Sequence, residues 1–418
     1  MTTYNPELVW IDGAFVTEKS ITVVEGVITE IGEGNGADKG AFLPGFVNAH
    51  SHAFQKSLRG KGEYFGKGTV EQNFWGWREE MYKLVDALSV DQFRELCVQC
   101  FSEMRQAGIT TVGEFHYFHH GKDIDYAMDL AVLDAAKEVG IRIVLLHAFY
   151  KHGGLLKEAL SGGQARFSTQ DLGQWWDQVD KLKSDTDNYM QRIGTVAHSV
   201  RAVDIETIKK IAIGSVQRGM PMHIHLEEQS QEIEACLEAH GVTPMALLND
   251  GIDVSPLVTA VHCTHSAAAD MEQWLSSGGN ICLCPLTEAN LADGICNMHR
   301  IVKQGGCVSL GTDSNARISM LEEMRWMEYA QRLHREERGV CIDESGSMAN
   351  YLIDAATKNG ARCLGIPGGE IAVGKLADFT VIDLEHLQLS GSTLETLPAA
   401  ICCGADNSVI AKTIIAGN

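Results

Sequence analysis

This chain of 418 residues has no long apolar run and little positive charge. No stretch approaches the ~18–20 consecutive apolar residues that a membrane-spanning helix needs, and no basic segment with an apolar core opens the sequence. We therefore expect neither a membrane anchor nor a signal peptide. Only 34 lysines and arginines stand against 55 aspartates and glutamates, which gives a formal net charge of −21. Such a chain repels nucleic acid and anionic membranes at long range, so we expect neither as a partner. A small anionic substrate is still compatible, because a few arginines can dominate a desolvated pocket.

The twelve cysteines lack the regular spacing of a disulfide framework. Cys97 and Cys100 have the spacing of a metal-binding pair, but they lie in a helical pattern, and no second pair follows at zinc-finger spacing. We therefore interpret the cysteines as buried, reduced thiols of a cytoplasmic protein.

Both ends of the chain are rich in β-type residues. Residues 8–44 contain short apolar runs separated by glycines, and residues 369–418 return to the same character. Neither end is long enough to bury a core alone. We expect residues 1–45 and 366–418 to form one small β-sandwich domain together, and residues 46–365 to form a catalytic domain.

The middle of the chain alternates between apolar strands and amphipathic helices. We predict strands at residues 46–52, 110–117, 142–150, 192–199, 221–228, 259–265, 280–286 and 307–313. Eight strands alternating with helices are typical of a (β/α)₈ TIM-like barrel, so the predicted fold class is α/β. An open doubly wound sheet is the alternative. It would place a glycine-rich phosphate-binding turn after the first strand, and none follows residue 52.

The first predicted barrel strand ends in His50-Ser-His52. Side chains alternate along a strand, so both imidazoles project together and can hold one divalent metal ion. Active sites of such barrels lie at the C-terminal ends of the strands, where His225 and Asp313 also fall. Taken singly, His225 could be a core histidine and Asp313 a helix N-cap. Neither interpretation explains why all four residues lie at strand ends, so we predict a metal site.

Three imidazoles and one carboxylate suit a metal ion that keeps an open position for water. We predict zinc for this donor set; iron and manganese accept the same ligands and are the alternatives. We interpret the remaining histidines near strand ends as polar lining rather than a second metal site, and His223 as a supporting or core residue. These lining histidines are His116, His119, His120, His147 and His152.

The chain resembles the amidohydrolase superfamily over its whole length. Pro44-Gly-Phe-Val-Asn-Ala-His-Ser-His matches the first metal motif of that family, and Gly374-Lys-Leu-Ala-Asp-Phe-Thr-Val-Ile-Asp matches its C-terminal β-sandwich motif. Two-metal members carry a bridging lysine at the end of the fourth strand. Residues 192–199 contain no lysine, so the resemblance implies one metal ion.

Further segments resemble the formimidoylglutamate deiminases within this superfamily. They are Phe74-Trp-Gly-Trp-Arg-Glu, Glu114-Phe-His-Tyr, His198-Ser-Val-Arg-Ala-Val, His223-Ile-His-Leu-Glu-Glu-Gln and Thr287-Glu-Ala-Asn-Leu-Ala-Asp-Gly-Ile. The resemblance implies hydrolysis of N-formimino-L-glutamate to N-formyl-L-glutamate and ammonia in histidine degradation. It also implies a homodimer.

Three catalytic roles follow for such a reaction. Asp313 would bind the metal and take a proton from the attacking water, and His262 would orient the nucleophile and stabilise the tetrahedral centre. Glu228 would carry a proton to the departing nitrogen, which needs a carboxyl with a raised pKa. The alternative for Glu228 is a solvated acidic residue at a helix start.

The two carboxylates of this substrate require cations. By resemblance, Arg78 and Arg201 hold them, because a guanidinium pairs with a carboxylate bidentately. Gln55, Tyr117 and His198 would act as hydrogen-bonding partners. The alternative for both arginines is a surface ion pair.

Other functions stay open from the sequence alone. Another one-metal deaminase or hydrolase would act on a guanine-like or adenosine-like ring or on a triazine. An imidazolonepropionase is a nearer alternative, but the segments Phe74–Arg78 and Thr287–Ile295 fit that enzyme less well. A non-catalytic scaffold relative is the alternative of a different class. Such proteins typically lose metal ligands, and this chain has all four.

Overall fold

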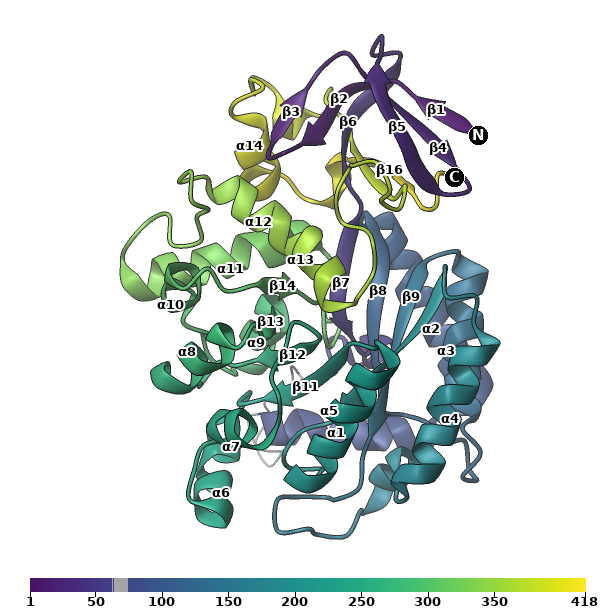
Figure 1. The fold of residues 1–418 in the computed structure, drawn as a ribbon, viewed down its shortest axis with the longest axis vertical. Helices are drawn as coiled ribbons and strands as arrows, with labels where there is room; N and C mark the ends of the chain where they lie inside the picture. Colours follow the sequence, from purple (N-terminus) through teal and green to yellow (C-terminus); the bar gives the residue numbers. More distant parts are fainter. Residues whose placement is uncertain (62, 64–73) are drawn as a thin grey trace.

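An eight-stranded parallel sheet forms the centre of the protein (Figure 1). The computed structural model describes residues 1–61, 63 and 74–418. The sheet order is β14-β13-β12-β11-β10-β9-β8-β7, so each strand pairs with its neighbour in the chain. The strands are β7 (Phe46–Ser51), β8 (Ile109–His116), β9 (Arg142–Phe149), β10 (Gln191–Ala197), β11 (Met222–Leu226), β12 (Val258–His262), β13 (Asn280–Leu283) and β14 (Val308–Leu310).

Helices cover the outside of this sheet, which explains why the strands are near-continuously apolar. Most of these strands, such as β8 and β9, are buried along their whole length. The covering helices are α2 (Val90–Gln106), α3 (Ala127–Val139), α4 (Leu172–Asp185), α5 (Ile205–Arg218), α6 (Ser230–His240), α7 (Pro244–Gly251), α8 (Ala268–Ser276), α9 (Pro285–Leu291), α10 (Met298–Lys303), α11 (Met320–Arg335), α12 (Met348–Ala356) and α13 (Lys358–Cys363). Local signals set several of their ends. Ser89 forms a capping box with Gln92 at the start of α2, and Gly219 ends α5 in a left-handed conformation.

Hydrogen bonds join the first and last strands of the sheet at their C-terminal tips. The backbone N–H groups of Thr312 and Asp313 both donate to the carbonyl of His50 at 3.0 Å, and Ser51 forms a parallel bridge with Asp313. The Asn48 amide donates to the Thr312 hydroxyl at 2.7 Å. The sheet is therefore closed into a barrel at the end that carries the predicted metal ligands.

Both chain ends meet in two smaller sheets beyond the N-terminal end of the barrel (Figure 1). One has the order β1-β4-β5, and the other has the order β16-β15-β6-β2-β3. Their strands are β1 (Thr2–Tyr4), β2 (Pro6–Ile11), β3 (Ala14–Val16), β4 (Lys19–Val24), β5 (Val27–Glu33), β6 (Asp38–Pro44), β15 (Phe379–Ile382) and β16 (Ile410–Ile414). A separate apolar cluster that includes Ile21, Phe42 and Phe379 fills the space between them. A buried ion pair between Arg142 and Asp378 ties this unit to the barrel, with contacts of 3.0 and 3.1 Å.

The predicted barrel is confirmed, and all eight predicted strands exist. All eight end earlier than expected, by one to three residues. β12 stops at His262 because the backbone turns left-handed at His262 (φ +75°) and Cys263 (φ +55°), and β14 stops before Asp313 (φ +43°). The domain boundaries at residues 45 and 366 stay predictions. No helix in the described part of the chain is long and apolar enough to cross a membrane.

Candidate metal centre and active site

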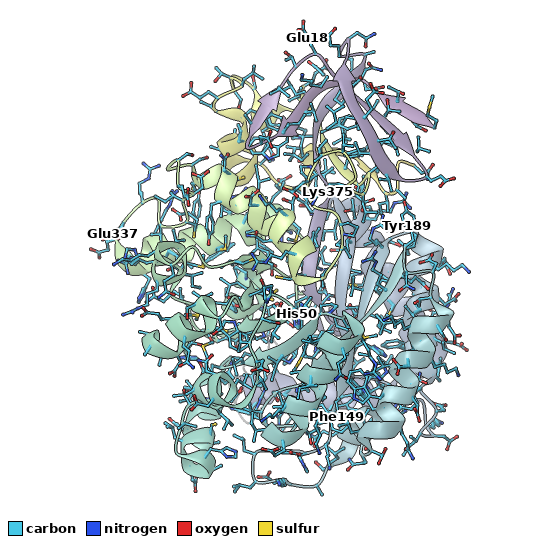
Figure 2. The ribbon with its side chains drawn as sticks, in the orientation of Figure 1. Glu18, His50, Phe149, Tyr189, Glu337 and Lys375 are labelled. Carbon is cyan, nitrogen blue, oxygen red and sulfur yellow. The ribbon has the colours of Figure 1, made fainter. Side chains whose placement is uncertain are left out.

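Four predicted metal ligands converge at the C-terminal end of the barrel. His50 and His52 come from β7, His225 from β11, and Asp313 from the segment after β14. Figure 2 shows His50 inside the barrel, on the side of the molecule away from Glu18 at the tip of the small sheets. All four side chains are almost completely buried.

The spacing of the donor atoms fits ligands that share one metal ion. His225 Nε2 lies 3.2 Å from His50 Nε2 and 3.4 Å from His52 Nε2. Asp313 Oδ1 lies 3.5 and 3.3 Å from the same two nitrogens. Ligands ~2.0–2.1 Å from a zinc ion at the corners of a tetrahedron are about 3.3 Å apart. These four separations, 3.2 to 3.5 Å, match the spacing of neighbouring ligands around one ion.

The protonation of the ring nitrogens also fits a metal. His52 Nδ1 faces the Phe115 carbonyl oxygen at 2.8 Å, so Nδ1 carries the hydrogen and Nε2 is left as a bare donor. Burial lowers the pKa of His50 to about 4 and that of His52 to about 3, which keeps both imidazoles neutral. His225 Nε2 lies 3.4 Å from the bare His52 Nε2 and 3.2 Å from His50 Nε2, so a cation between the three rings would satisfy all three nitrogens together. These residues therefore fit a single divalent ion.

A second histidine cluster lies behind the barrel wall and has a different geometry. His116 Nε2 and His119 Nδ1 each lie 2.9 Å from Asp129 Oδ1, and His147 Nε2 lies 2.8 Å from Asp129 Oδ2. Gln178 donates to the same carboxylate at 3.0 Å. Each nitrogen faces an oxygen at ordinary hydrogen-bond distance, and none of these distances joins two nitrogens. This cluster is a hydrogen-bonded hub around a buried carboxylate.

The predicted catalytic acid Glu228 and His262 lie beside the metal centre. His262 Nε2 is 3.8 Å from Glu228 Oε1 and 3.8 Å from Asp313 Oδ2. Burial raises the pKa of Glu228, although the charges of His262 and Arg201 oppose the shift. Burial also opposes ionisation of Asp313, but the adjacent imidazoles of His50, His52 and His262 hold its pKa below the usual range. The pKa of Glu228 is therefore shifted upward, as an acid requires, and the pKa of Asp313 is shifted downward, so that Asp313 stays ionised as a base.

A cavity adjoins this centre and contains all five predicted substrate-binding residues. Gln55, Arg78, Tyr117, His198 and Arg201 line it. Metal ligands and the predicted acid line the same cavity, namely His52, His225, Asp313 and Glu228.

The polar residues of this cavity are held in place by neighbours. The Gln55 amide donates to the Tyr117 hydroxyl at 2.7 Å. Arg78 stacks over Trp75 with its guanidinium carbon 4.4 Å from the ring centroid. Arg201 is partly buried, with its side chain 13% exposed, its Nε 3.4 Å from Glu232 and its Nη2 3.8 Å from Glu228. Neither arginine is a plain surface ion pair.

The structure also adds residues that the sequence did not single out. Tyr82 and Tyr150 line the cavity, and Gln164 donates to both hydroxyls at 3.1 and 3.2 Å. Glu232 lies behind Arg201, and burial raises its pKa to about 7. Glu288 lies behind His262. The only sequence signal for these residues was that Glu288 falls within the segment 287–295, which resembles the formimidoylglutamate deiminases. The two tyrosines and Glu232 belong to no recognisable motif.

Comparisons with known proteins agree with this geometry. Formimidoylglutamate deiminase of Pseudomonas aeruginosa is 36% identical over 370 residues, which cover 86% of this chain and 81% of that protein. The 8-oxoguanine deaminase of the same organism is 26% identical over 89% of this chain and 80% of its own length.

Among solved structures, an amidohydrolase from Brucella melitensis superposes with a TM-score of 0.90 at 30% identity, covering 100% of this chain and 94% of that one. An adenosine deaminase from Xanthomonas campestris with bound zinc shares the fold, with a TM-score of 0.82 at 21% identity over 100% and 92% of the two chains. The sequence pattern described as "Amidohydrolase family" matches residues 41–418. The chain belongs to the amidohydrolase family.

Proposed function

We propose that this protein hydrolyses N-formimino-L-glutamate to N-formyl-L-glutamate and ammonia. The observation that carries the proposal is the single cavity lined by Arg78 and Arg201 together with His225, Glu228 and Asp313. A hydrolytic centre and two guanidinium groups in one pocket suit a substrate with an amidine carbon at one end and two carboxylates at the other. The similarity to the Pseudomonas aeruginosa formimidoylglutamate deiminase supports the same substrate.

A divalent metal, most simply zinc, would be held by His50, His52, His225 and Asp313. Bound there, it would supply Lewis-acid chemistry that lowers the pKa of a water molecule and polarises the C=N carbon. The second histidine cluster around Asp129 is not needed for this reaction.

The side chains of this protein would then move the protons. Asp313 accepts a proton from the attacking water, for which its lowered pKa keeps it ionised. His262 Nε2 lies 3.8 Å from Asp313 Oδ2, so it faces the place where the water attacks. From there it stabilises the tetrahedral carbon. Glu228 delivers one proton to the terminal nitrogen as the water oxygen adds to the C=N carbon, which gives a tetrahedral carbon bearing a hydroxyl and an amino group. The proton held by Asp313 then passes to the amino nitrogen, the C–N bond breaks and ammonia leaves, while the hydroxyl proton returns to Glu228. Water supplies the oxygen of the formyl group and the balance of hydrogen.

The far end of the cavity would bind the glutamate part of the substrate. Arg201 and Arg78 pair with the two carboxylates. Gln55, Tyr117 and His198 add hydrogen bonds. Burial lowers the pKa of His198, and the charge of Arg201 lowers it further, so this ring is neutral and can offer one donor and one acceptor.

Ammonia release by the zinc-loaded protein tests the proposal directly. N-formimino-L-glutamate should be turned over at least 100-fold more efficiently, as kcat/KM, than guanine, adenosine, an aminotriazine or imidazolone propionate. Preferential turnover of a ring substrate would instead support a purine-type or triazine-type deaminase. A folded protein that binds no metal and releases no ammonia from any of these compounds would support the scaffold interpretation.

The homodimer, the cytoplasmic location and a role in histidine degradation stay proposals with the substrate. Light scattering after size-exclusion chromatography tests the dimer, because a mass near twice 45.6 kDa is expected. A mass near that of one chain would contradict it.

A further inference from the structure

The imidazole of His262 is held at one nitrogen and points into the active site with the other. Its Nε2 faces Glu228 and Asp313 at 3.8 Å and has no hydrogen-bond partner within the described residues. Its Nδ1 lies 3.4 Å from Glu288 Oε1. The ring is almost completely buried, so water offers little alternative to these neighbours.

Glu288 is itself fixed in place. It lies in α9, and its Oε1 accepts the backbone N–H of Cys284 at 2.9 Å. The side chain is about 5% exposed and does not line the cavity that contains Arg78 and Arg201. It lines a different cavity of about 300 Å³, together with Pro285, Ala289 and Trp326. Among the described residues, Glu288 therefore contacts the reacting groups through His262.

We propose that Glu288 is a positioning residue for His262. A carboxylate can only accept hydrogen bonds, so it fixes the hydrogen on Nδ1 and sets the plane of the ring. Nε2 is then presented to the space between Glu228 and Asp313, where the nucleophile and the reacting carbon meet. The inference rests on the proposed function, because it assigns Glu288 a part in the same hydrolysis.

A simpler role for Glu288 is to accept the Cys284 N–H at the start of α9. Substitutions separate the two roles. Glu288→Gln keeps an acceptor for Cys284 but loses the charge, whereas Glu288→Ala loses both. A residue that serves only the helix would affect stability and leave kcat unchanged when the acceptor is kept.

The kinetic test uses the zinc-loaded full chain and N-formimino-L-glutamate. We expect Glu288→Gln to lower kcat about tenfold and Glu288→Ala about 100-fold, with KM changed less than threefold and metal content unchanged. Glu272→Ala, which removes an exposed glutamate from α8, is the matched control and should keep the wild-type kcat. Unchanged kcat in both Glu288 variants would overturn the proposal.

Chemical rescue and crystallography make the test specific. The neighbouring 300 Å³ cavity can admit formate to the space that Glu288→Ala leaves, so formate should restore at least part of kcat, and formamide, which has no charge, should restore less. A crystal structure of zinc-bound Glu288→Ala should show the His262 ring rotated from its wild-type plane.

The outcomes also separate this inference from the proposed function. If wild-type protein does not turn over N-formimino-L-glutamate, the proposed function fails and the ring orientation alone decides the inference. An unmoved His262 ring in Glu288→Ala would refute the inference in either case, and absence of rescue by formate would count against it where the wild-type protein is active.

Discussion

The backbone N–H of His52 donates to the carbonyl oxygen of Asp313 at 2.9 Å. Two predicted metal ligands that are 261 positions apart in the chain are thereby joined at the seam of the barrel. Asn315 strengthens this junction, because its amide donates to the Ser51 hydroxyl and to the carbonyls of His52 and Asp313 at 3.0–3.1 Å. The same hydrogen bonds that close the barrel therefore set the distance between ligands from its first and last strands.

Asn315→Gly should weaken metal binding. Glycine accepts the left-handed backbone at this position (φ +56°), so the change adds no strain. It removes these three hydrogen bonds and a fourth, which the Asn315 side-chain oxygen accepts from the Thr312 hydroxyl at 2.6 Å. Loss of such supporting contacts typically costs about 10–100-fold in metal affinity. Competition with a zinc chelator measures it. Asn188→Gly is the control, because Asn188 is also left-handed (φ +54°) but exposed, and equal affinities in all three proteins would contradict the role of Asn315.

Arg201→Met should keep the metal and lose the substrate. Methionine fills much of the space of the partly buried arginine but cannot pair with a carboxylate. We expect kcat/KM for N-formimino-L-glutamate to fall at least 100-fold, with metal content unchanged by elemental analysis. Arg218→Met is the control, because it removes a guanidinium that pairs with Asp180 outside the cavity. Its kcat/KM should stay near the wild-type value. Near wild-type kcat/KM in Arg201→Met would show that Arg201 does not clamp a carboxylate.

Glu228→Gln should separate proton transfer from binding. Glutamine keeps the size of the side chain and can still occupy the position 3.8 Å from His262, but it cannot deliver a proton. We expect kcat to fall by about 10²–10⁴-fold while metal content and KM change little. Glu234→Gln, an exposed position on α6, controls for the altered net charge. An active Glu228→Gln enzyme would remove this residue from the proton path.

The sequence predicts the barrel well because its signals are local. Alternating apolar strands and helices identify the order of elements, and the position of the active site follows from where strands end. His50 and His52 could be paired from strand geometry alone. His225 and Asp313 needed only the assumption that all strand ends meet at one rim.

The supporting residues could not be predicted in the same way. Glu232 and Glu288 act on Arg201 and His262 from other elements, and no spacing in the chain links either pair. The seam contacts of Asn315 depend on barrel closure, which is a long-range event. The early ends of β12 and β14 arise from left-handed residues such as His262 and Asp313, where tertiary contacts override local preference.

Glu114 makes the stability of the folded chain depend on pH, and this dependence can be measured. Its Oε1 accepts the Ala53 N–H at 2.6 Å, and its Oε2 has no hydrogen-bond partner in the described ranges. Burial raises the pKa of this carboxyl from 4.5 to about 8, although the hydrogen bond from Ala53 opposes the shift. The folded chain therefore keeps this proton at neutral pH, whereas the unfolded chain releases it.

Glu114→Gln should consequently stabilise the protein, and more so as the pH rises. Because the pKa of Glu114 is higher in the folded chain than in the unfolded chain, the wild-type protein has its full stability below pH ~4.5, where both states hold the proton. That stability is lost progressively as the pH rises to ~8, and the loss amounts to roughly 3 kcal/mol at pH 7. Glutamine is neutral at every pH and avoids this loss. Thermal unfolding at constant zinc should show little difference between variant and wild type at pH 5 and a higher Tm for the variant at pH 7.5.

Glu103→Gln provides the opposite case. Burial raises the pKa of Glu103, but hydrogen bonds and charge from Arg59 and Lys56 outweigh burial and lower it, so this variant should lose stability toward neutral pH. A Tm gain for Glu114→Gln that does not grow with pH would mean that the Glu114 carboxyl is already ionised in the folded chain.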